Sequence, residues 1–241
     1  MFNLFKRKQQ ETPKLVQYTD DMMFGEIAVA RDFVWNFDNN PTIFITGGVG
    51  SGKITCQELI MYQCAELGYS VHCVDIQKAT LTPFNKLHIY TEIEDVKKFI
   101  DKCISTQFDE PQFIVVDEIA HLFSNEYETN ILSGLLYLIR HGEEHNVYMC
   151  LGSNYAEFPA SDLNSDFSRC IDVLVEEGRT PIISLGNLSP TKSNRLFESK
   201  KYQRDGGTGV GCLRLDRVVY PIQIYYISNN LLQKYAESPL S

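Results

Sequence analysis

The sequence lacks several features that would place it in a specialised class of protein. It has no run of about 18 apolar residues, so we expect no membrane-spanning helix. A basic cluster occupies residues 6–8, but no apolar segment follows it, which excludes a secretory signal. No internal repeat or low-complexity segment interrupts the 241 residues. What remains is an ordinary globular composition, 44% hydrophobic and 12% aromatic, that can bury a substantial core.

The sequence also lacks the paired cysteines of a zinc site. Seven cysteines are present, and no two of them form a C-x-x-C pair. They are Cys56, Cys64, Cys73, Cys103, Cys150, Cys170 and Cys212. Most stand in apolar contexts, where a thiol behaves as a small buried hydrophobe. This usage fits a reduced, cytoplasmic compartment.

Excess positive charge is absent as well, because 22 basic residues face 31 acidic ones and the net charge is −9. This balance excludes a monomer that binds nucleic acid through a broad basic face. An acidic subunit can still handle DNA if basic loops from several copies converge on a channel. One basic stretch surrounds Tyr202, and it can be read as a solvated loop or as a loop facing DNA. Its cations are Lys192, Arg195, Lys200, Lys201 and Arg204.

Apolar strand runs and amphipathic helices alternate from residue 42 onward. The expected strands cover residues 42–46, 71–74, 113–116, 147–151 and 171–175, and the expected helices cover residues 53–67, 96–104 and 129–140. Such alternation produces parallel strands joined by crossover helices, and continuous apolar strands indicate a sheet covered on both faces. We therefore predict an α/β fold with a mainly parallel central sheet flanked by helices.

The ends of the chain differ from this pattern. Residues 1–20 are polar and patternless, so we expect a tail followed by a single domain over 21–241. A small β element is expected within 24–37, and a C-terminal β-hairpin within 213–227. Residues 178–211 are rich in Gly, Ser, Pro and Lys and are expected to be irregular.

The glycine-rich segment G-G-V-G-S-G-K-I-T carries the main chemical signal. It comprises Gly47, Gly48, Val49, Gly50, Ser51, Gly52, Lys53, Ile54 and Thr55. Glycines let the backbone turn tightly and aim N–H groups at phosphate oxygens, and the following helix favours the same anions. Lys53 would reach the β- and γ-phosphates. Because an apolar strand precedes the loop and an amphipathic helix follows it, we predict that this segment binds ATP.

Ile54 departs from the P-loop pattern, which places a Mg²⁺-binding hydroxyl directly after the lysine. Thr55 lies about 100° further round the helix and cannot simply substitute. Most phosphate contacts come from the backbone, so nucleotide binding should survive this change. The residues leave three hypotheses open: a slow ATPase, a rearranged Mg²⁺ site, or a module that binds ATP without hydrolysing it.

Two later strands end in polar side chains that suit the same chemistry. Residues 113–116 run into Asp117 and Glu118, a Walker B pattern in which Asp117 would hold Mg²⁺ and Glu118 would orient the attacking water. The strand over 147–151 is followed by Gly152, Ser153 and Asn154, and we interpret Asn154 as a sensor of the γ-phosphate. The alternative for Asn154 is an ordinary turn residue at the end of a strand.

The order of these motifs resembles that of the FtsK/SpoIIIE–HerA superfamily of ring ATPases. The resembling features are the strand and P-loop, the D-E-x-x-x-L-F segment, a leucine-rich helix ending in Arg-x-Gly, and a strand with a terminal amide. Asn154 stands where the translocases of that family carry glutamine. The segment from Asp166 to Val173 resembles the one in which an arginine opens a strand, which implies that Arg169 is a finger reaching a neighbouring subunit. The resemblance covers residues 23–228.

The resemblance implies a RecA-like core that assembles as a homo-oligomeric ring, with six subunits in family members. Such rings thread double-stranded DNA, or drive protein export beside membrane-associated conjugation and secretion proteins. A motor of this length suits a mobile element, plasmid or virus. A non-hydrolysing nucleotide-binding module remains the alternative, favoured by Ile54. A small-molecule kinase is a third hypothesis. The lack of an evident arginine-rich lid argues against it.

Overall fold

An eight-stranded mixed sheet organises the chain in a computed structural model that describes residues 27–30, 33–76, 87–123, 128–154, 165–176, 179–198 and 207–226. The strands are β1 (Ile27–Ala30), β2 (Phe33–Trp35), β3 (Thr42–Gly47), β4 (Ser70–Val74), β5 (Leu87–Tyr90), β6 (Gln112–Val116), β7 (Val147–Ser153), β8 (Ile182–Leu185), β9 (Val210–Leu215) and β10 (Val218–Gln223). Their order in the large sheet is β10-β9-β8-β3-β7-β6-β4-β5, and β1 pairs with β2 separately. From β8 to β5 neighbouring strands are parallel. The predicted α/β class with a mainly parallel sheet is confirmed.

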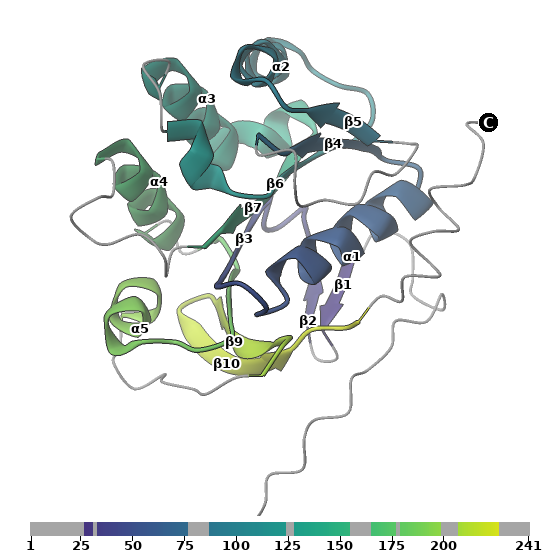
Figure 1. The fold of residues 1–241 in the computed structure, drawn as a ribbon. Coiled ribbons are helices and arrows are strands. Elements are labelled where there is room, and N and C mark those ends of the chain that lie inside the picture. The colour runs from purple at the N-terminus through teal and green to yellow at the C-terminus, as the bar shows by residue number, and fades with distance from the viewer. Residues whose placement is uncertain are drawn as a thin grey trace, which may run out of the picture.

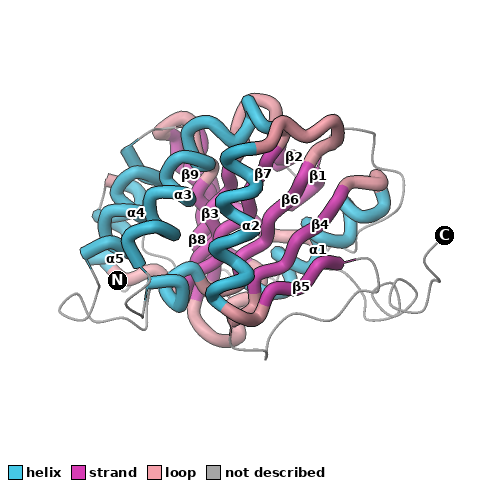
Figure 2. Tube along the Cα trace, turned by 90° about the horizontal axis from the view of Figure 1, so that it is seen from above, coloured by secondary structure: helices cyan, strands magenta, loops and turns pink. Residues whose placement is uncertain are grey.

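Helices cover both faces of this sheet. They are α1 (Lys53–Glu66), α2 (Ile93–Ser105), α3 (Glu128–His141), α4 (Ser165–Glu176) and α5 (Pro190–Phe197), with short 3-10 helices at Ile119–Phe123 and Gly142–His145. Figure 1 shows α1 and the β1–β2 pair on one side of the sheet and α2, α3 and α4 on the other, and Figure 2 gives the same arrangement from above. The expected short β element near the N-terminal end is therefore the β1–β2 pair.

Alternation along the strands divides the apolar residues between two cores. In β3, Ile43 and Ile45 belong to the core beneath α1, whereas Phe44 belongs to the core beneath α2, α3 and α4. All three side chains are fully buried, so β3 lies at the centre of the molecule. The seven cysteines are also buried, as their apolar contexts predicted. The loop that follows β3 is therefore anchored to a strand that is buried along its whole length.

The strand expected over 171–175 is wrong, because these residues form the second half of α4. The apolar run over 171–175 fits a strand only when the apolar residues that precede it are left aside. Phe167, Cys170, Ile171 and Leu174 recur at helical spacing and are all buried. The alternating Asp172 is exposed between them. A short apolar run fits a buried helix face as well as a buried strand, and here the longer period decides.

Two elements form within residues 178–211, which were expected to be irregular, and a further strand, β5, was not predicted. Strand β8 completes the parallel sheet beside β3, and α5 follows it within the segment rich in Gly, Ser and Pro. Ser189 caps α5 by accepting a hydrogen bond from Lys192 N at 3.3 Å, and Pro190 occupies the first turn. Strand β5 forms one edge of the sheet against β4. The predicted C-terminal hairpin is confirmed as β9 and β10.

Some expectations concern residues outside the described ranges. The tail over 1–20 lies there, as do Lys200, Lys201 and Arg204 of the basic stretch. Within the described ranges, every helix is too short or too polar to cross a bilayer. The same ranges contain no group of three or more His, Cys, Asp or Glu side chains arranged to hold a metal ion.

Candidate nucleotide-binding site

The P-loop leaves the sheet at Gly47 and enters α1 at Lys53. Gly50 and Gly52 have φ angles of 75° and 98°, in the left-handed region that other residues rarely adopt. A Cβ at Gly47 would lie 2.3 Å from Ser51 Oγ, so a larger residue there would clash within the loop itself. Gly52 forms the N-cap of α1 without a side-chain cap, which leaves the first N–H groups of the helix available to an anion. The loop therefore has the backbone geometry that phosphate binding requires.

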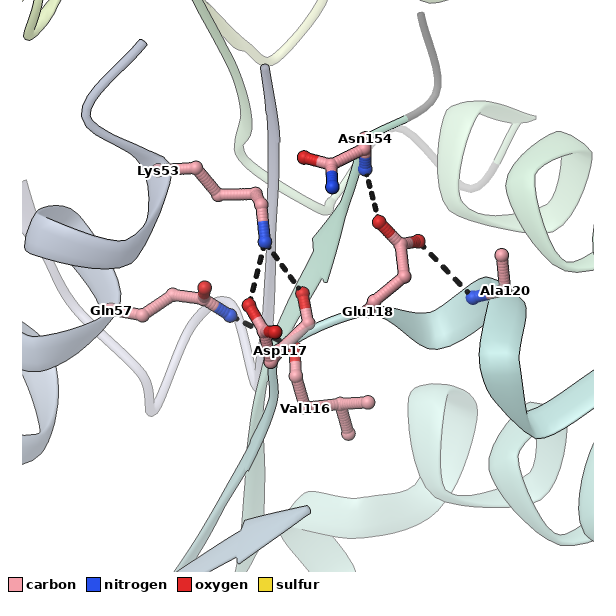
Figure 3. A network of polar contacts seen from close by, with 7 residues as sticks. All are labelled: Lys53, Gln57, Val116, Asp117, Glu118, Ala120 and Asn154. Carbon is pink, nitrogen blue, oxygen red and sulfur yellow. Dashed lines mark hydrogen bonds and ion pairs between the residues drawn. The ribbon is translucent and has the colours of Figure 1, made fainter. Parts of the chain in front are cut away.

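Strand order brings three chain segments to the end of this loop. β7 lies between β3 and β6, with Thr46 beside Ser153 and Val116 beside Leu151. Parallel strands end at the same edge of the sheet, so the P-loop, the Asp117–Glu118 pair and Asn154 emerge next to one another. Figure 3 shows Lys53, Asp117, Glu118 and Asn154 around one space. This position, at the carboxyl ends of the strands, is where α/β sheets bind ligands.

Lys53 and Asp117 form a buried ion pair across this space. Lys53 Nζ lies 2.7 Å from Asp117 Oδ1 and donates a second hydrogen bond of 2.9 Å to the backbone oxygen of the same residue. The side chains are only 5% and 8% exposed, so both charges depend on each other for solvation. Lys53, which was expected to bind phosphate, and Asp117, which was expected to hold Mg²⁺, are thus already in contact.

Glu118 lies beside this pair and is held by backbone groups. Its two carboxylate oxygens accept hydrogen bonds from Ala120 N and Asn154 N, as Figure 3 shows. Burial raises the pKa of Glu118 above its ordinary value. The hydrogen bond from Asn154 N and the charge of Lys53 counteract that rise in part. A fixed carboxylate with a raised pKa is suited to accept a proton from water.

Asn154 occupies the end of β7 and contributes through two parts. Its backbone N–H orients Glu118, and its side-chain amide is directed into the same space as Lys53 and Glu118 (Figure 3). Ile54 and Thr55 follow Lys53 on α1, and both are partly exposed. Arg169 does not join this group: it lies exposed on α4.

Gln57 and Gly152 belong to the site although their residue types gave no signal in the sequence. Gln57, one turn after Lys53 on α1, is fully buried and donates to Val116 O at 2.9 Å. A Cβ at Gly152 would lie 2.2 Å from Asp117 O and 2.5 Å from Gln57 Nε2. Only glycine at this point lets β7 pack against the Walker B turn. The G-S-N ending of β7 is the one sequence feature that pointed toward this packing.

Several polar atoms around the loop are buried without a hydrogen-bond partner within the described residues. They are Thr46 Oγ1, Ser51 Oγ and Gln57 Oε1. Leaving such a group unpaired costs about 1–3 kcal/mol, so buried polar atoms normally find a protein, water or ligand partner. Their presence at the P-loop agrees with a site built to receive a polar ligand.

The basic stretch is committed in part to the fold. Arg195 of α5 donates to Ser168 O at 3.1 Å and Ser168 Oγ at 2.8 Å on α4, and pairs with Asp172 Oδ1 at 2.9 Å. This arginine therefore ties α5 to α4. Arg195 is therefore not available to contact DNA, as one of the two interpretations of this stretch required. The residues of the stretch beyond 198 lie outside the described ranges.

The strand, P-loop and helix, with acidic residues at the end of β6 and a further strand between, define the class: the chain has a P-loop ATPase fold. The predicted resemblance to FtsK/SpoIIIE-type ATPases is confirmed at the level of the fold. Comparison with protein-family profiles gives no match, and comparison with curated protein sequences gives none either.

The chain is similar in fold to several solved structures. The pCW3 conjugation coupling protein TcpA, in its monomer form with ATPγS, is 16% identical with a TM-score of 0.73 over 93% of this chain and 75% of TcpA. EssC ATPases 2 and 3 from Geobacillus thermodenitrificans are 13% identical with a TM-score of 0.67, over 93% of this chain and 50% of EssC. The genome packaging NTPase B204 from Sulfolobus turreted icosahedral virus 2, with ATPγS, is 10% identical with a TM-score of 0.51, over 77% of this chain and 98% of B204. At identities this low, the structural similarity establishes a shared fold and nothing beyond it.

Proposed function

We propose that this chain is an ATP-driven motor domain that hydrolyses ATP and uses the energy to translocate double-stranded DNA. The observation that carries the proposal is the buried Lys53–Asp117 pair with Glu118 beside it, at the ends of adjacent parallel strands. A phosphate-binding lysine and a fixed, buried carboxylate within one space are what hydrolysis of a phosphoanhydride requires. A purely structural ion pair would not need Glu118 buried at the same point.

Each residue has a role in this proposal. The loop from Gly47 to Thr55 holds the phosphates through backbone N–H groups, and Lys53 leaves Asp117 to neutralise the β- and γ-phosphate oxygens. Glu118 accepts a hydrogen bond from the attacking water and takes its proton as the water oxygen bonds to the γ-phosphorus and the bond to ADP breaks. The amide of Asn154 contacts the γ-phosphate and links its presence to Glu118 through the backbone.

Mg²⁺ fits the site in part. The carboxylate of Asp117 is a hard oxygen ligand beside the P-loop, whereas Ile54 offers no oxygen. When bound, the ion would neutralise charge on the phosphate oxygens. We place it near Asp117, and the missing hydroxyl at position 54 predicts weak Mg²⁺ affinity rather than loss of nucleotide binding.

Arg169 is proposed to act on the ATP site of a neighbouring subunit in a ring, for which six copies are the expectation. Its exposed position on α4 leaves it available to a second copy of the chain, and Arg195 fixes that helix one residue away at Ser168. An arginine supplied from outside stabilises the charge of the transferring phosphoryl group. A ring also answers the net charge of −9, because DNA contacts can then be shared among copies.

Double-stranded DNA is the proposed cargo. The solved structures with this fold include a conjugation coupling protein and a genome packaging NTPase, which support DNA, and a type VII secretion ATPase, which supports protein export. A cytoplasmic location beside membrane-associated conjugation or secretion proteins accompanies either cargo.

Steady-state ATP hydrolysis with Mg²⁺ tests the proposal, measured with and without linear double-stranded DNA and at several protein concentrations. We expect turnover that rises with DNA and with protein concentration, as a ring assembles. A matched variant, Arg169→Ala, should lose the concentration-dependent part while still binding ATP. An ATPase indifferent to DNA, in a chain that stays monomeric at every concentration, would remove translocation from the account.

Ile54 supports a second candidate, a module that binds ATP without turnover within a conjugation or secretion assembly. It predicts ATP binding with no hydrolysis in the wild type, and hydrolysis gained on Ile54→Ser. The buried Glu118 speaks against this candidate, since a binding-only module gains nothing from keeping a destabilising carboxylate there.

A further inference from the structure

A turn from the C-terminal part of the chain lies against the outer side of the P-loop. Thr208 Oγ1 donates a hydrogen bond of 2.9 Å to Gly50 O, and Gly209 N donates one of 2.7 Å to Ser51 O. A Cβ at Gly52 would come within 2.9 Å of Gly209 N, so the two backbones are in close contact. We infer that Thr208 and Gly209 are positioning residues that hold the P-loop amides in their phosphate-binding orientation.

The geometry of the peptide unit connects these two contacts to the orientation of the loop amides. In a planar trans peptide the C=O and the next N–H point in opposite directions. Fixing Ser51 C=O outward against Gly209 therefore turns the Gly52 N–H toward the interior of the loop. Fixing Gly50 C=O against Thr208 holds the Ser51 N–H on the opposite side, where it bonds Gly48 O at 3.1 Å and braces the turn of the loop. Convergent N–H groups are what an anion-binding loop must present.

The turn is itself anchored to the body of the protein. Gly209 O accepts a hydrogen bond of 2.9 Å from Ile224 N, and Tyr225 N donates one of 3.0 Å to Val29 O in β1. β1 is in turn joined to α1, because Gln63 both donates to Ala28 O at 2.9 Å and accepts from Ala28 N at 2.8 Å. Hydrogen bonds thus connect the P-loop to the segment that follows β10, then to β1, and from β1 back to α1.

This rigidity matters more in this chain than in one with a hydroxyl after the lysine. Ile54 contributes no metal ligand, so affinity for nucleotide depends more heavily on the loop amides. Preorganising those amides avoids the entropy of ordering them at the moment of binding. The inference rests on the proposed nucleotide site, and it assigns to Thr208 a role in affinity rather than in the chemical step.

The test compares Thr208→Val, which removes the donor at nearly constant shape, with Thr208→Ser, which restores it. Titrations with ATPγS and with ADP give the dissociation constants, and thermal unfolding without nucleotide gives stability. The control is Thr191→Val, which changes an exposed threonine on α5. We expect Thr208→Val to weaken both nucleotides by about three- to tenfold, the loss of one hydrogen bond, with kcat unchanged. Thr208→Ser should recover wild-type affinity.

Three results would overturn the inference. One is equal affinity of wild type and Thr208→Val, and another is a Thr208→Ser variant as weak as the valine variant. The third is an affinity loss matched by a fall in unfolding temperature beyond that of Thr191→Val, because the contact would then serve the fold alone. A wild-type chain that binds neither nucleotide overturns the proposed function as well, which separates the two failures.

Discussion

The Nζ atom of Lys53 lies 2.7 Å from Oδ1 of Asp117, and both side chains are buried beside the P-loop. Each charge therefore helps to solvate the other while the pair is closed. In the proposed function, a nucleotide would exchange this contact for contacts of Lys53 with phosphate and of Asp117 with Mg²⁺. Nucleotide binding and the stability of the unliganded protein are consequently linked through the same two residues.

Lys53→Ala is expected to destabilise the protein in addition to impairing ATP binding. It leaves the Asp117 carboxylate buried without its cation, which costs about 3–5 kcal/mol. Chemical denaturation without nucleotide measures this change. Lys98→Ala is the matched control, because Lys98 pairs with Asp95 at 3.0 Å on the surface, where such pairs contribute about 0–1 kcal/mol. Equal unfolding free energies for the two variants would contradict the buried pair.

Glu118→Gln is expected to change how the stability of the protein depends on pH. Burial raises the pKa of Glu118 in the folded state, so folding favours the protonated form. The stability linked to this group is present below the pKa of the unfolded state and is lost as pH rises through the folded pKa. The unfolding temperature of the variant relative to that of wild type should therefore be higher at pH 8 than at pH 4. A difference independent of pH would count against a perturbed Glu118.

Ile54→Ser is expected to lower the Mg²⁺ concentration needed for half-maximal hydrolysis. The new hydroxyl would stand where P-loops usually ligate the ion. Thr55→Val is the control, since its hydroxyl points elsewhere on the helix and should leave the Mg²⁺ dependence unchanged. If Thr55→Val instead abolishes the response to Mg²⁺, the loop uses Thr55 as a substitute ligand and the metal site is rearranged.

Gly152→Ala is expected to lower the free energy of unfolding by about 3 kcal/mol, the cost of severe overpacking. The added methyl would lie 2.2 Å from Asp117 O, so β7 and the Walker B turn must separate. Gly207→Ala serves as the comparison, because a Cβ there meets nothing within 4 Å. Denaturant titration of the two variants distinguishes local crowding from a general effect of replacing glycine.

The sequence predicted those parts of the fold whose local signals agree with their tertiary setting. β3, the P-loop and α1 were found because an apolar strand, turning glycines and an amphipathic helix coincide there. The hairpin of β9 and β10 was also predicted from its local sequence. α4 was mistaken in part for a strand because its buried run at Ile171–Val175 satisfies both periods over five residues.

The site was predictable by residue type but not in its packing. Lys53 was identified from the P-loop pattern and Asp117, Glu118 and Asn154 as strand-end residues, and strand order brings them together. No local pattern could reveal that Lys53 bonds Asp117, that Gln57 spans to Val116, or that Thr208 supports the loop. These contacts join segments between 59 and 158 residues apart, which no local period can encode.

The catalytic role of Glu118 is tested most directly by single-turnover hydrolysis of γ-labelled ATP with Mg²⁺, comparing wild type with Glu118→Gln after both are shown to bind ATP equally. The account predicts release of labelled phosphate by wild type and a rate lower by about 100-fold or more in the variant, the usual contribution of a general base. Equal rates in the two proteins, or no release by wild type despite bound ATP, would contradict it.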